Sequence, residues 1–136
     1  MSEGKGIVMT MNARNKSVIQ APYTVEQLMS LLSDVCDGQN MFSHQDFVYW
    51  CEKYTLFHYK YEMDESQWLA DLESEERAHF AKAFLIAKDV PAKWQQYLMQ
   101  QFSFQDLKNQ PLQDILIPQA YFVQWLTELY SYDHVN

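Results

Sequence analysis

From residue 22 onward, apolar residues recur at the spacing of amphipathic helices. The first stripe has i, i+3, i+4 and i+7 spacing and consists of Leu28, Leu31, Leu32 and Val35. Thr24 precedes it as a candidate N-cap, with Gln27 three residues later as in a capping box. Gly38 can adopt the left-handed conformation that ends a helix. The pattern predicts a helix between Thr24 and Gly38.

The most aromatic stretch of the chain, Phe42 to Trp68, contains nine aromatic residues. Its first half repeats the helical spacing, at Phe47, Trp50, Cys51 and Tyr54. Ser43 is the expected N-cap, and Asp46 occupies the place of the acid in a capping box. From Thr55 to Tyr61 aromatic residues alternate with mostly polar ones, which predicts a short strand. The alternative is an extended linker that lays its rings on the helical core.

Further helices are expected in the second half of the chain. The apolar edge of Ser66–Leu72 favours a short helix, and Ser74 is placed to cap a longer one over Glu75–Lys88. Asp89–Pro91 is expected to break that helix, with Pro91 starting the next. The last helix is expected to begin at Pro118.

The centres of four apolar stripes predict one shared core cluster, made of Trp50, Phe84, Trp94 and Trp125. We therefore predict a mainly α fold: a compact single-domain bundle of about five or six helices. A small β element is the expected addition, from an N-terminal arm (residues 1–21) and residues 55–61. The helical domain is expected to span residues 22–136.

Composition and charge argue against several classes of function. The net charge of −8 and the pI near 4.8 argue against nucleic-acid binding, because phosphate backbones repel such a chain. No apolar run approaches the roughly 18–20 residues of a membrane span, and no signal-peptide layout is present. Cys36 and Cys51 are expected to be reduced, buried thiols, which favours a cytoplasmic location.

The sequence offers little for catalysis, a metal or a cofactor. No two of the candidate metal ligands have the close spacing that is typical of zinc sites. The candidates are Cys36, His44, Cys51, His58 and His79. Glu76–His79 is one Glu-x-x-His unit, whereas di-iron bundles need two. With three glycines and no Gly-x-Ser-x-Gly motif, neither a phosphate loop nor a hydrolase elbow is indicated. We expect no catalytic, cofactor or metal residues.

The region from Glu62 to Glu76 holds seven acidic residues and no basic one. Just after it, Ile86 is the one large apolar residue expected on a polar helix face. Acidic charge around an apolar centre resembles the rim and core of a binding patch. The predicted partner surface comprises Glu62, Asp64, Glu65, Asp71, His79, Lys82 and Ile86. The alternatives are a merely solvated acidic surface, or an Ile86 that meets the N-terminal arm within the same molecule.

The sequence thus favours a non-enzymatic, acidic protein-interaction module, such as an adaptor, inhibitor, immunity-type or regulatory protein. Its expected partner is another protein, basic in character, and a homo-oligomer is compatible with the pattern. The surplus of Tyr and Trp supports such a surface, because these residues are enriched at interfaces. The alternative is a small-ligand carrier with an aromatic-lined pocket, and an enzyme ranks third.

Overall fold

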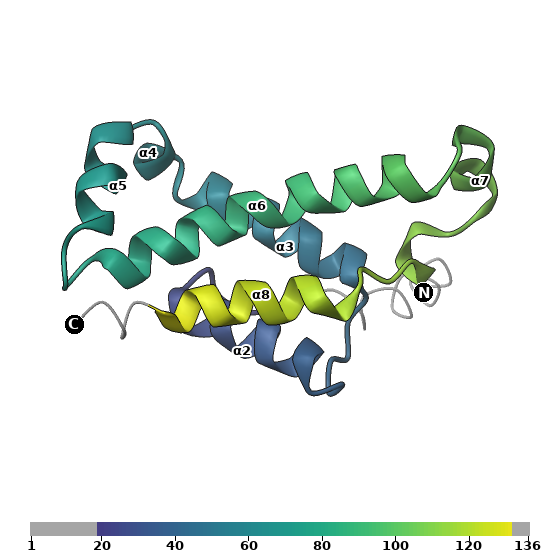
Figure 1. The fold of residues 1–136 in the computed structure, drawn as a ribbon, viewed down its shortest axis with the longest axis horizontal. Helices are drawn as coiled ribbons and strands as arrows, with labels where there is room; N and C mark the ends of the chain where they lie inside the picture. The colour runs from purple at the N-terminus through teal and green to yellow at the C-terminus, as the bar shows by residue number, and fades with distance from the viewer. Residues whose placement is uncertain (1–18, 132–136) are drawn as a thin grey trace, which may run out of the picture.

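Residues 19–131 are described by the structure, a computed structural model, and they form helices joined by short connections (Figure 1). The helices are α2 (Val25–Cys36), α3 (His44–Phe57), α4 (Tyr59–Glu62), α5 (Glu65–Leu72), α6 (Ala78–Gln101), α7 (Phe104–Asn109) and α8 (Gln119–Tyr130), with a 3-10 turn at Leu112–Asp114. The predicted mainly α bundle is confirmed. The β element predicted for the N-terminal arm falls largely outside the described residues, which include only residues 19–21 of that arm.

Helix α6 is the longest element, and it contacts α2, α3, α5 and α8 (Figure 1). Helix α8 packs against both α6 and α2, so residues from the two ends of the described chain lie side by side. Helices α4 and α5 form a corner beside the start of α6. In residues 19–131, no helix is long and apolar enough to cross a membrane.

The N-terminal caps follow the local sequence closely. The Thr24 hydroxyl accepts a hydrogen bond from the amide of Gln27 at 3.2 Å, and α2 begins at the next residue after Thr24. Ser43 and Asp46 form a reciprocal capping box at the start of α3. At the other end of α2, Gly38 has φ of +70°, as the helix-ending position requires. These short-range signals therefore gave the right helix ends.

The strand predicted for residues 55–61 is wrong. Helix α3 continues to Phe57, and α4 follows after a change of direction at His58. The His58 ring reaches the carbonyl oxygen of Tyr23 at 3.1 Å. Of the alternating aromatic residues, Tyr61 packs inward on Phe80 and Phe84, whereas Phe57 and Tyr59 are exposed. The alternation therefore does not correspond to two faces of a strand.

The predicted helix break at Pro91 is also wrong. Helix α6 starts at Ala78 rather than Glu75, and it passes through Pro91 without ending. Ser74 still accepts from the amide of Arg77 at 3.3 Å, but in the turn that precedes the helix. Proline has a helical φ and removes one backbone hydrogen bond. The buried stripe continues on both sides of it, through Ala87, Val90, Trp94 and Leu98, and its packing offsets that loss.

The predicted core cluster is confirmed: Trp50, Phe84, Trp94 and Trp125 are all buried in one cluster. The polar edges of two of these rings are satisfied. Trp50 Nε1 donates to the carbonyl oxygen of Ala21 at 3.0 Å, and Trp125 Nε1 donates to Asp89. Both cysteines are free thiols, with Cys51 fully buried. The two thiols are unpaired as predicted, but Cys36 is only partly buried, whereas both had been predicted to be buried.

Candidate interaction surface

Three of the predicted acidic residues lie exposed at the α4–α5 corner. Glu62, at the end of α4, forms an ion pair with Lys88 of α6 at 3.1 Å. Asp64 caps α5 by accepting from the amide of Gln67 at 3.1 Å. Glu65 lies in the first turn of α5, where its negative charge interacts favourably with the helix dipole. These acids therefore combine local structural roles with surface exposure.

Asp71 does not belong to this exposed set, because its side chain is buried. Its carboxylate accepts from Tyr61 at 2.7 Å and from Gln67 at 2.8 Å, and Arg77 lies 3.5 Å away. Burial opposes ionisation, but these two hydrogen bonds and the Arg77 charge outweigh it and lower the pKa of Asp71. Asp71 therefore ties α4 to α5 and to the turn before α6.

Ile86 is 4% exposed and belongs to the core, so its predicted place on a polar face is wrong. The prediction considered α6 alone, and α8 covers that side of the helix. Its neighbours His79 and Lys82 are partly buried. The Lys82 ammonium donates to the hydroxyl of Ser131, just after α8, at 3.1 Å. The proposed apolar centre of the partner surface is therefore a packing residue between α6 and α8.

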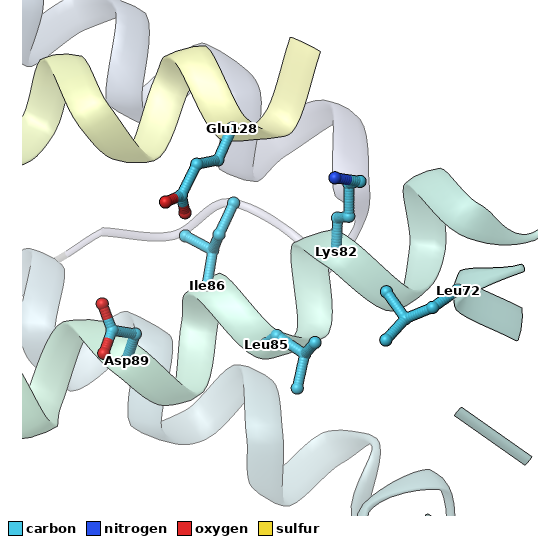
Figure 2. Close-up of a pocket in the computed structure, with 6 residues that line it drawn as sticks. All are labelled: Leu72, Lys82, Leu85, Ile86, Asp89 and Glu128. Carbon is cyan, nitrogen blue, oxygen red and sulfur yellow. The ribbon is translucent and has the colours of Figure 1, made fainter. Parts of the chain in front are cut away.

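A cleft of about 450 Å³ opens where α5, α6 and α8 meet, and we call it the α6–α8 cleft (Figure 2). Its lining combines aliphatic and charged side chains: Leu72, Lys82, Leu85, Ile86, Asp89 and Glu128. It brings together Lys82 and Ile86 from the predicted site. Glu62, Asp64, Glu65, Asp71 and His79 are not among its lining residues. The predicted site is thus divided between the cleft and the α4–α5 corner.

The exposed apolar residues that sequence reasoning missed lie at the junction of α3 and α4. Four large side chains within eight residues are between 55% and 82% exposed, and we call them the α3–α4 surface: Leu56, Phe57, Tyr59 and Met63. The Phe57 ring is held by Tyr23, with 5.6 Å between ring centroids. A helical projection continued past Tyr54 places Leu56 opposite the buried stripe, but it places Phe57 at the edge of that stripe, so the pattern signals only the exposure of Leu56. A smaller exposed pair, Met99 and Phe104, lies near the end of α6.

In residues 19–131 no group of three His, Cys, Asp or Glu side chains is placed to hold a metal ion. Comparison of the chain with protein-family models, curated proteins and solved structures found no match. The geometry of its surfaces therefore carries the functional argument.

Proposed function

We propose that the protein is a non-enzymatic interaction module that binds a basic protein partner through its α3–α4 surface. The observation that carries this proposal is the cluster of exposed apolar side chains at Leu56, Phe57, Tyr59 and Met63. Single exposed apolar residues are ordinary, but a contiguous group with a polar rim is typical of an interaction site. In this proposal Leu56, Phe57, Tyr59 and Met63 take the place of Ile86 as the apolar centre, and the exposed acids nearby in the chain supply the polar rim.

The charge near this surface favours a basic partner over a second copy of the chain. Glu62 ends α4, Asp64 and Glu65 come just after it, and all three are exposed. The whole chain carries a net charge of −8, so two copies would repel each other. A basic partner would be steered towards the acidic rim, and the apolar centre would hold the complex together. A cytoplasmic location belongs to the same proposal, and the two free thiols support it.

The test uses two double variants matched in residue type and exposure. Leu56→Asp/Met63→Asp alters the α3–α4 surface, and Met41→Asp/Leu116→Asp places the same charges on exposed side chains elsewhere. A partner captured from the source cell with the wild-type protein is purified and its affinity is measured for each form. We expect the first variant to lose at least tenfold in affinity and the control to lose little, with unchanged melting temperatures.

Salt dependence separates the two parts of the surface. Neutralising Glu62, Asp64 and Glu65 should slow association at low ionic strength, and this difference should fade as salt screens the charges. The apolar variant should instead speed dissociation at every salt concentration. Equal loss of affinity in the surface and control variants would refute the proposal. A dimer of the wild-type chain that the surface variant alone abolishes would also refute it in favour of self-association.

A further inference from the structure

Negatively and positively charged side chains lie toward opposite ends of the α6–α8 cleft (Figure 2). The carboxylates of Asp89 and Glu128 lie at one end, on the same side of Ile86. Lys82 lies toward the other end, near Leu72. Between them Ile86 and Leu85 provide an aliphatic floor. The volume of about 450 Å³ is within the range of small-ligand sites.

The Asp89 carboxylate is held in a fixed orientation. The buried Trp125 donates its indole N–H to Asp89 Oδ2 at 2.9 Å, and the Lys93 ammonium donates to Oδ1 at 3.0 Å and to Oδ2 at 3.2 Å. A carboxylate has about four acceptor positions, so these three hydrogen bonds leave about one position, on Oδ1, for another donor. Lys93 offsets part of the Asp89 charge, and Glu128 supplies a second negative charge from α8. A cation entering here would meet acceptors from two different helices.

We propose that the α6–α8 cleft binds an alkylammonium group, with the cation between Asp89 and Glu128 and the alkyl chain over Ile86 and Leu85. The carboxylates and the aliphatic floor together favour an alkylammonium ligand. Its alkyl chain would bury methylene groups, and its ammonium group would gain charged acceptors. The positive Lys82 disfavours a second cation at the far end. A lysine side chain of a peptide and a free alkylamine share this chemistry. The inference does not rest on the α3–α4 surface.

The first test is an NMR titration of the ¹⁵N-labelled full chain with hexylamine, hexanol and hexanoate. We expect hexylamine to give saturable shifts at backbone amides near the cleft, in residues 82–89 and 125–131. Hexanol, which lacks the charge, should bind about tenfold more weakly, and hexanoate should not saturate. Equal binding of hexylamine and hexanol, or shifts centred away from the cleft, would overturn the proposal.

The second test removes one carboxylate without touching the core. Glu128 is exposed, so Glu128→Gln should leave the melting temperature unchanged and weaken hexylamine binding about tenfold. The matched control is Glu65→Gln, which makes the same charge change outside the cleft and should not alter hexylamine binding. An undiminished affinity in Glu128→Gln would exclude the assigned position of the cation. Leu56→Asp/Met63→Asp should retain hexylamine binding, whatever becomes of the partner surface.

The source of the alkylammonium group is decided by a third titration, with the peptide Gly-Gly-Lys-Gly-Gly and its norleucine counterpart. Tighter binding of the lysine peptide than of hexylamine would assign the cleft to a partner's side chain. Tighter binding of hexylamine would assign it to a free amine. Both results support the shared chemistry. Binding of the norleucine peptide as tightly as the lysine peptide would contradict it.

Discussion

His44 Nδ1 accepts a hydrogen bond from the backbone N–H of Ile117, with 2.7 Å between the two nitrogens. The bond joins the first turn of α3 to the segment that precedes α8, and the imidazole also packs on Phe122 at 4.6 Å between centroids. Because Nδ1 accepts, the folded protein holds the neutral ring with its proton on Nε2. Burial lowers the pKa of His44 to about 4.

This arrangement predicts a loss of stability in mild acid. Between pH 6.5 and about 4 the unfolded chain takes up a proton at His44 and the folded chain does not, so stability falls as the pH falls. The fall in the pKa of His44 on folding corresponds to about 3 kcal/mol of unfolding free energy lost across this pH range. Below about pH 4 both states are protonated, and this contribution levels off. Urea midpoints measured from pH 7.5 to 4 would show the slope.

The control for this prediction is His44→Asn, whose side-chain oxygen can accept from Ile117 but cannot titrate in this range. The variant should be less stable than wild type at neutral pH, because it packs less well against Phe122. Its stability should, however, depend much less on pH between 6.5 and 4. The same slope in both proteins would assign the acid sensitivity to other groups.

Asp71 is predicted to contribute more to stability than any exposed acid around it. Replacing it with Ala leaves the Tyr61 hydroxyl and Arg77 without their carboxylate and should cost about 2–3 kcal/mol. Tyr61→Phe removes one of these bonds and should cost about 1 kcal/mol or more. Glu73→Ala, at an exposed neighbouring site, should change stability by less than about 0.5 kcal/mol. Chemical denaturation of the three variants compares them, and equal effects would show that the network adds nothing.

The hydroxyl of Tyr54 is buried, and no hydrogen-bond partner among the described residues reaches it. Burial is also the main cause that raises the pKa of Tyr54. Removing a buried polar group that lacks a partner should cost little, so Tyr54→Phe should be neutral or stabilising by about 1 kcal/mol. Thermal unfolding measures this. A destabilisation of more than about 1 kcal/mol would reveal a partner for the hydroxyl.

Ile86→Ala should destabilise the protein by about 2–4 kcal/mol, because it opens a cavity between α6 and α8. Met99→Ala, on the exposed side of the same helix, is the matched control and should stay within about 0.5 kcal/mol of wild type. Denaturant midpoints distinguish the two. An Ile86→Ala variant as stable as wild type would instead indicate that Ile86 is exposed, as the sequence pattern had predicted.

The sequence predicted features that depend on near neighbours in the chain. Thr24, Ser43 and Gly38 mark helix ends through contacts within a few residues, and the structure confirms all three. Features decided by distant elements were not predictable in this way. Ile86 is buried because α8 covers it, and α6 continues past Pro91 because the same stripe packs on both sides.

The candidate surface likewise combines features that near neighbours in the chain made predictable with features that depend on distant elements. Glu62, Asp64 and Glu65 were correctly expected to be exposed, because acidic residues are rarely buried. Asp71 is the exception, and its burial depends on Tyr61 and Arg77 being brought to it by neighbouring elements. The apolar centre was misplaced because Ile86 was assigned to a polar face from its own helix alone, without α8 beside it. The cleft could not be predicted at all, since it needs the relative positions of α5, α6 and α8.

The pairing of α2 with α8 has a consequence during synthesis. The Gln119 side-chain amide donates to the carbonyl oxygen of Cys36, 83 residues earlier in the chain, at 3.0 Å. At about 5–20 residues per second, a ribosome needs roughly 4–17 s to make the intervening segment. Throughout that interval the apolar side of α2, including Leu28 and Leu32, has no α8 to cover it. A nascent chain stalled before Gln119 should therefore be a ready substrate for chaperones that bind exposed apolar helices.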